Sequence, residues 1–262
     1  MALLTIDHAE LMRWITAVMW PFVRIGALLV AAPLFGARTV PVRVRIALAL
    51  VLAFAVAPLL PPLDPVDPLS LPGALVAVRE ALIGTALGFL LQMVFGAMAM
   101  GGEIVALSMG LAFASVVDPE RGASVPLVGQ YFVIFSTLVF VALDGHLALV
   151  AMLFESFVLM PPSAGAFGPA GFWEVVAWGS EMFQAAVQVA LPASASLLVA
   201  GVSMGMIARS APQLNVFAVG FPLTLTLGLV VLALTLPGLA PQLETVLESV
   251  FVAMRNVLGA AR

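Results

Sequence analysis

Asp144-Gly145-His146 is the part of this 262-residue chain most suggestive of catalysis, since an acid and a histidine beside a serine would complete a hydrolytic triad. The serine elbow G-x-S-x-G is absent from the sequence, however. No two carboxylates stand at a spacing typical of general acid–base catalysis. We therefore interpret Asp144 and His146 as marking a helix end, and we predict that the chain is not an enzyme.

Metal and nucleic-acid chemistry has still less support. The chain has no Cys, and His8 and His146 stand far apart. No ligand set has metal-binding spacing, so we expect no metal and no other cofactor. A net charge of −4 without a basic run argues against nucleic acid as a partner.

Ionisable residues within apolar surroundings form a third class of candidates. Arg24 lies deep in an apolar run, and Arg79 and Glu80 stand together at the edge of another. A charge at the bilayer centre costs about 2.5–3.5 kcal/mol on insertion scales, so such groups face protein or water. A proton or ion relay is one interpretation of these residues. Placement at helix boundaries is the other, and it is the commoner explanation for such residues.

The composition indicates a membrane protein. Apolar residues make up 63% of the chain and charged residues 9%, against about 45–50% and 25% in soluble domains. A soluble globule of this size could not cover its surface with so few charges. The apolar excess must therefore face lipid, other protein chains, or both.

Long uncharged runs set the expected fold. About twenty helical residues span the hydrocarbon core, and six runs reach or approach that length. These runs are Trp14–Phe35, Ile46–Leu63, Ala81–Gly102, Gly122–Leu143, Met182–Ala208 and Ser210–Leu243. The sequence thus predicts an all-α, polytopic membrane protein with about six long helical segments.

Two apolar stretches do not fit a simple span. Ile104–Val117 is short, and Gly145–Trp173 is broken by Glu155 and by the Pro161–Gly165 turn. We expect re-entrant or broken pieces here. Irregular backbone at membrane depth needs protein or water around it, so function is expected near these segments.

Arginines suggest the orientation. Arg38, Arg43 and Arg45 crowd the first connection, and Arg209 lies in the fifth. The positive-inside rule places these connections in the cytoplasm and the N-terminus outside.

Glycines predict close helix packing. Gly84-x-x-x-Gly88 and Gly201-x-x-x-Gly205 each place two glycines on one helix face.

Residues 241–262 carry apolar side chains at helical spacing, which predicts an amphipathic helix begun by Pro241. That helix would lie on the membrane or, as we favour, dock on a partner.

Five blocks of motifs stand in a fixed order along nearly the whole chain. They are Pro33-Leu34-Phe35-Gly36 with Pro41–Arg45; Gly110–Ala114 with Asp118-Pro119 and Gly122; Gly129-Gln130; Leu143-Asp144-Gly145-His146 with Ser156-Phe157; and Ala208–Phe217, which includes Pro212, Gln213 and Asn215, with Phe221-Pro222. In this order, and in a chain of this length, they resemble the FliR family of flagellar type III export proteins and its counterparts in virulence injectisomes.

The resemblance implies a structural pore component of the flagellar export gate. Such proteins assemble with FliP and FliQ in the basal body, in the bacterial inner membrane, with FlhB and FlhA as further partners. Unfolded flagellar subunits pass through the gate as transient substrates. By this resemblance residues 1–180 are FliP-like, and residues 181–262 form a FliQ-like hairpin and an amphipathic C-terminal helix.

The resemblance also assigns roles to particular residues. It implies that residues 110–122 form a loop that plugs the closed pore, with Gly110, Phe113, Asp118, Pro119 and Gly122 in that loop. The Arg209–Asn215 turn is expected at the cytoplasmic tip of the hairpin, near FlhB. Much of such a chain lies in the assembly above the lipid, so not every apolar segment need cross the bilayer.

Alternatives stay open at this stage. Service in an injectisome is one, although the 118–119 and 209–217 motifs favour the flagellum. A secondary transporter would explain broken segments and buried ionisable groups, but its internal repeat is not evident. An intramembrane enzyme using Asp144 and His146 ranks last.

Overall fold

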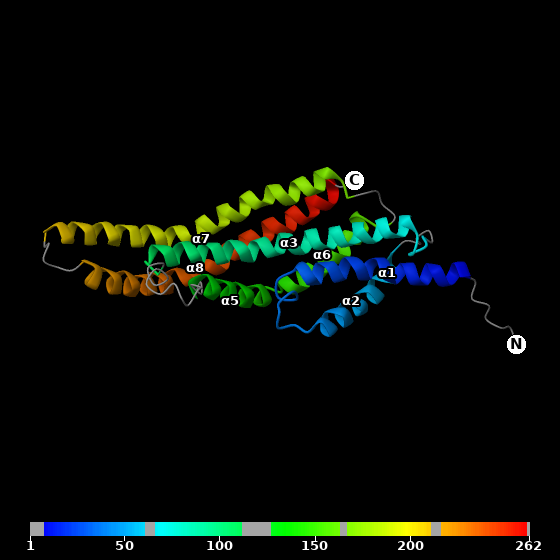
Figure 1. Cartoon of the computed structure of the whole chain (residues 1–262), viewed down its shortest axis with the longest axis horizontal. Coiled ribbons are helices and arrows are strands. Elements are labelled where there is room, and N and C mark those ends of the chain that lie inside the picture. Colours follow the sequence, from blue (N-terminus) through cyan, green and yellow to red (C-terminus); the bar gives the residue numbers. More distant parts are fainter. Residues whose placement is uncertain (1–7, 61–65, 112–126, 163–166, 211–215, 261–262) are drawn as a thin grey trace. The chain divides into compact units, whose positions relative to one another are not determined.

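The computed structural model describes residues 8–60, 66–111, 127–162, 167–210 and 216–260. All regular structure in this part of the chain is helical (Figure 1). The elements are α1 (His8–Ala31), α2 (Val42–Val56), the short 3-10 helix η1 (Ala57–Leu59), α3 (Leu71–Ser108), α5 (Leu127–Ala142), α6 (Gly145–Leu159), α7 (Pro169–Ser210) and α8 (Val216–Ala260).

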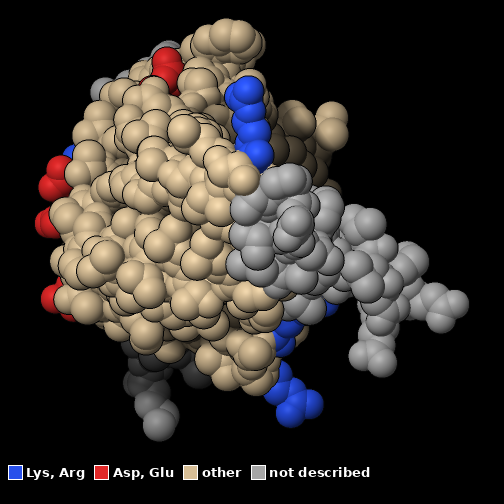
Figure 2. All heavy atoms as spheres, turned by 90° about the vertical axis from the view of Figure 1, so that its left-hand side faces the viewer, with Lys and Arg blue, Asp and Glu red and all other residues tan. Residues whose placement is uncertain are grey.

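The helices confirm the predicted all-α, polytopic class. Five of them are long and apolar enough to cross a membrane, and the consecutive pair α5 and α6 would make a sixth span if counted as one bent element. Few charges are visible on the face shown in Figure 2, where most of the described surface is uncharged. Such a surface suits contact with lipid or with other apolar chains.

Three helices are much longer than the runs from which they were predicted. α3, α7 and α8 hold 38, 42 and 45 residues. At 1.5 Å per residue they measure about 57, 63 and 68 Å, whereas the hydrocarbon core is about 30 Å thick. Only part of each can therefore lie in lipid. The boundaries expected at charged residues were wrong because Glu is a good helix former and does not end a helix.

The C-terminal tail differs from its prediction in two ways. Pro241 lies inside α8 and does not begin a separate helix. Long apolar helices tolerate such prolines when neighbours satisfy the freed backbone groups. In addition, Val250, Met254 and Val257 are buried in the chain's own core, so this part of the apolar face needs neither a membrane surface nor a partner.

The chain divides into two compact units, and α3, α7 and α8 contribute to both. Unit 1 comprises residues 1–93, 144–179 and 248–262, and unit 2 comprises residues 94–143 and 180–247. The core of unit 1 includes Trp20, Ile25 and Leu28 of α1, Ile83, Leu87 and Leu90 of α3, and Leu149, Leu153 and Phe157 of α6.

Unit 2 has its own core. Phe95 and Phe140 pack edge to face with ring centroids 5.7 Å apart. The small residues Ala97 of α3 and Ala185 and Ala186 of α7 form a buried cluster in the same unit. Small side chains let helices approach closely, so α3 and α7 pack tightly in this unit.

Candidate functional site, a buried arginine–glutamate cluster

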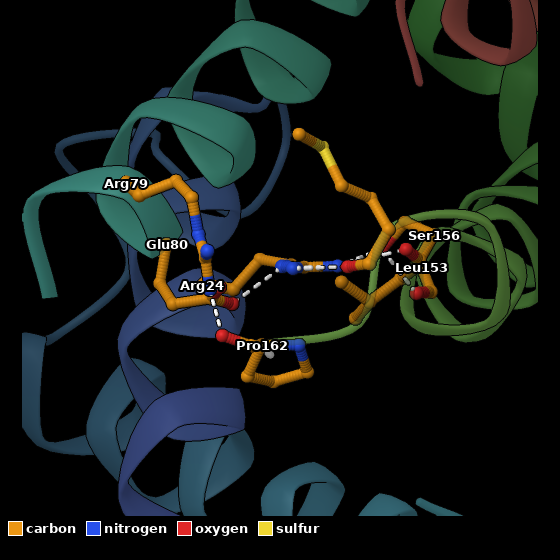
Figure 3. Close-up of polar contacts among 7 residues, drawn as sticks. Arg24, Arg79, Glu80, Leu153, Ser156 and Pro162 are labelled. Carbon is orange, nitrogen blue, oxygen red and sulfur yellow. Dashed lines mark hydrogen bonds and ion pairs between the residues drawn. The ribbon is translucent and has the colours of Figure 1, made fainter. Parts of the chain in front are cut away.

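Two opposite charges meet in the core of unit 1. Arg24 of α1 and Glu80 of α3 are both fully buried, and Arg24 Nε lies 2.8 Å from Glu80 Oε2 (Figure 3). Both helices consist mainly of apolar residues. Removing two charges from water is costly, and only a close pair with further hydrogen bonds offsets that cost.

Arg24 supplies those further hydrogen bonds to α6. Its Nη1 donates to the Ser156 carbonyl at 2.9 Å and to Ser156 Oγ at 3.1 Å, and its Nη2 donates to the Met160 carbonyl at 2.7 Å. The guanidinium also lies 4.3 Å from the centre of the Phe157 ring. The last carbonyls of a helix lack partners within it and carry partial negative charge, so Arg24 caps the C-terminal end of α6.

Arg79 adds a second cation to the cluster. Its Nη2 lies 3.2 Å from Glu80 Oε1 and also donates to the Pro162 carbonyl, as Figure 3 shows. Glu80 therefore accepts from two arginines, one with each carboxylate oxygen. The segment that follows α6 is tied to α3 by the same contacts.

The geometry suits a fixed tie between three helices. A guanidinium keeps its proton in proteins, so Arg24 and Arg79 offer no relay for protons. The hydrogen bonds of Arg24 join α1 to α3 and to the end of α6, and Arg79 joins α3 to the segment that follows α6. The cluster can thus set the register of these helices, a role buried charges play in several proteins.

Glycines allow the helices beside the cluster to approach. A methyl group built on Gly84 would overlap the carbonyl oxygen of Arg24, and one on Gly88 would lie 2.7 Å from the Ala31 Cβ. In unit 2, Gly102 of α3 and Gly129 of α5 make a similar crossing, because a Cβ on Gly102 would lie 2.7 Å from the Gly129 Cα. At Gly201 and Gly205, in contrast, no atom of the described residues lies within 4 Å of a built Cβ.

Gly110 is the described residue among those assigned to the plug. It has φ of 82°, its N–H donates to the Leu107 carbonyl at 3.0 Å, and the Leu111 N–H donates to the Ala106 carbonyl at 3.1 Å. This pattern is the Schellman motif that ends a helix, and it favours glycine at the left-handed position. Phe113, Asp118, Pro119 and Gly122 lie outside the described residues.

Asp144, Gly145 and His146 lie at the bend between α5 and α6. Asp144 adopts a left-handed conformation with φ of 55°, and its carbonyl accepts from the Leu147 N–H at 2.8 Å. The helix end expected here is therefore present. His146 Nδ1 is buried and has no hydrogen-bond partner among the described residues.

The remaining predicted residues lie mostly on the surface. Arg38, Arg43, Arg209, Gln130, Phe221 and Pro222 are exposed, whereas Arg45 is half-buried. Arg45 Nη2 donates to the carbonyls of Gly36 and Val40, at 3.3 and 3.0 Å, and so holds the turn before α2. Pro212, Gln213 and Asn215 lie outside the described residues.

Sequence reasoning missed part of the cluster. It identified Arg24 as a costly charge but favoured a boundary position for Glu80, and that interpretation was wrong because Glu80 is fully buried. The cost of a lone buried arginine was the signal that a carboxylate from another helix must reach it. Ser156 was identified as part of a family motif, but the motif did not indicate that its carbonyl and its hydroxyl both accept from Arg24.

Within the described residues, no group of three or more His, Asp or Glu side chains is arranged to hold a metal ion.

Comparison with known proteins covers almost the whole chain. The sequence pattern of the bacterial export proteins, family 1, matches residues 15–250. The flagellar biosynthetic protein FliR of Pectobacterium carotovorum subsp. carotovorum is 37% identical over 256 residues, or 98% of each chain. FliR of Escherichia coli (strain K12) is 35% identical over 257 residues, again 98% of each chain. FliR of Bacillus subtilis (strain 168) is 32% identical over 91% of this chain and 93% of its own.

Proposed function

This chain belongs to the bacterial export proteins, family 1, and we propose that it forms the pore of the flagellar export gate together with FliP and FliQ. Family membership makes it a membrane component of the flagellar export apparatus, and a structural component rather than an enzyme. The match also confirms the resemblance inferred from the motifs. The proposal adds that the gate stands in the inner membrane, beside FlhA and FlhB, and passes unfolded flagellar subunits.

The observation that carries the proposal is the end-to-end match to FliR proteins, over 98% of this chain. The surface of unit 2 supports an assembly. On α7, the large apolar side chains Leu198, Val202 and Met206 are exposed, and beside them Gly201 and Gly205 have open space. A helix face of this kind suits close packing against another apolar helix.

Co-purification tests the assembly. We expect this chain, co-expressed with FliP and FliQ of the same organism, to elute in mild detergent as one complex that contains all three. Gly201→Leu with Gly205→Leu should reduce the recovered complex at least several-fold, because the added side chains would keep the partner helix away. A solitary, monodisperse wild-type chain would contradict the proposal and favour a transporter that acts alone.

The control for this pair is Gly259→Leu. Gly259 is also helical, and within the described parts of the chain no atom lies within 4 Å of a Cβ built on it, but it lies at the end of α8 in unit 1. We expect this variant to assemble like the wild type. An equal loss of recovered complex in the two variants would mean that Gly201 and Gly205 are not specifically required for assembly.

We further propose that residues 110–122 close the pore in the resting gate. The family resemblance supports this proposal. Gly110 supports it too, because the Schellman motif at this glycine ends α3 where the segment 110–122 begins. Deleting residues 112–122, which leaves Gly110 in place, should raise the ion conductance of gates reconstituted in sealed vesicles. Deleting residues 62–64, in another connection, is the control. Conductance of the first variant equal to that of the wild type would disprove the plug.

A further inference from the structure

After the arginines of its first turn, helix α2 is apolar on all sides, and it is largely uncovered. Of its side chains, only Ala49, Ala53 and Val56 are buried. Large apolar side chains are exposed around the rest of the helix, namely Val42, Val44, Ile46, Leu50, Val51 and Phe54. A helix without a polar face is stable next to hydrocarbon, whether lipid chains or another protein's side chains.

The charge around α2 has one sign. Residues 11–63 contain five Arg and neither Asp nor Glu. Arg24 is engaged with Glu80, and Arg45 donates to the carbonyls of its own turn. Arg38 and Arg43 are exposed at the N-terminal end of α2, and neither has an acidic partner among the described residues. This pair of guanidiniums is therefore available to an anion.

One of these arginines, Arg38, lines an open depression. The depression measures about 430 Å³ and combines polar side chains, Arg38 and Gln92, with the apolar residues Val30, Leu34 and Ala37. Leu34 adopts a left-handed conformation with φ of 71°, which is uncommon for a large side chain. The first turn of α2 has no side-chain cap, so its amide groups add positive potential nearby.

We propose that this end of α2 binds an anionic phospholipid. The phosphate lies on Arg38 and Arg43, because guanidinium matches phosphate in charge and geometry. Gln92 hydrogen-bonds the glycerol headgroup in the depression, and the acyl chains follow the exposed face of α2. Free phosphate would use the arginines alone and leave that face uncovered. Charge complementarity and the adjoining apolar helix thus favour a lipid, and the assignment does not depend on the gate function.

Native mass spectrometry of the full chain in mild detergent tests the site. Phosphatidylglycerol should remain bound, and phosphatidylcholine with the same acyl chains should not. Arg38→Gln with Arg43→Gln should weaken phosphatidylglycerol binding at least ten-fold, since one arginine near an anionic surface contributes about a factor of five. Arg209→Gln removes an exposed arginine from α7 and should bind like the wild type.

A photoreactive phosphatidylglycerol gives a second test that needs no substitution. In the wild-type chain the label should fall within residues 30–54 or on Gln92. Labelling elsewhere, equal binding of phosphatidylcholine, or full binding by the double variant would overturn the proposal. Displacement of the lipid by millimolar inorganic phosphate would make the site a phosphate site. Exclusion of the lipid from the co-purified complex would make this face a protein interface.

Discussion

Arg24 and Glu80 show what a single residue in the sequence predicts about its contacts in the folded chain and what it does not predict. Arg24 stands out in the sequence because a charge in an apolar helix requires compensation. Its partner lies 56 residues away, and three of its hydrogen-bond acceptors come from Ser156 and Met160, more than 130 residues away. Such contacts depend on how three helices pack, and no local pattern encodes that packing.

Glu80→Gln tests the contribution of the cluster to stability. The change keeps the shape of the side chain but removes the carboxylate from the fully buried guanidinium of Arg24, and removing one partner of a buried pair costs about 3–5 kcal/mol. We expect the Tm of the purified chain in mild detergent to fall by roughly 6–20 °C.

Glu155→Gln is the matched control for that change. Glu155 pairs with Arg255 at 3.0 Å, but both side chains are largely exposed, at 38% and 54%. Exposed pairs contribute about 0–1 kcal/mol, so this variant should lose less than about 4 °C. Similar losses in the two variants would show that the buried cluster is no more important than a surface pair.

At the scale of the helix, the sequence predicted which segments are helical better than it predicted where each helix begins and ends. Long uncharged runs identified every long helix, but charges and prolines were poor guides to where helices end, as Glu103 in α3 and Pro241 in α8 show. The same limit applies to glycine motifs. Gly84-x-x-x-Gly88 packs against α1, whereas Gly201-x-x-x-Gly205 has open space, because spacing defines a face but not its neighbour.

Gly84→Ala tests the close contact of α1 and α3. The added methyl group would overlap the backbone of Arg24, and overpacking costs about 1–3 kcal/mol, partly offset by the better helix propensity of Ala. Gly26→Ala is the control, because none of the residues that the structure describes has an atom within 4 Å of a Cβ at that position of α1. We expect a lower Tm for the first variant and an unchanged or higher Tm for the second. The reverse order would exclude Gly84 as the point of closest approach.

For the whole molecule, composition was enough to place the chain in a membrane, and motif order was enough to identify its family. What neither could supply is the surface that other chains or lipids cover. The structure shows two exposed apolar surfaces to which we assign such contacts, the glycine face of α7 and the apolar helix α2. Both contain mainly uncharged side chains, and in the sequence such side chains look the same whether they face a core, a lipid or a partner.

The most direct test of the export function is the release of flagellar subunits from cells. In a strain that lacks the gene for this chain, flagellar filament protein should be absent from the culture medium and should return when the wild-type gene is supplied. Supplying the Glu155→Gln variant should also restore release, whereas Glu80→Gln should restore less. Filament protein in the medium of the deletion strain, at the level of the parent strain, would contradict a role in the export gate.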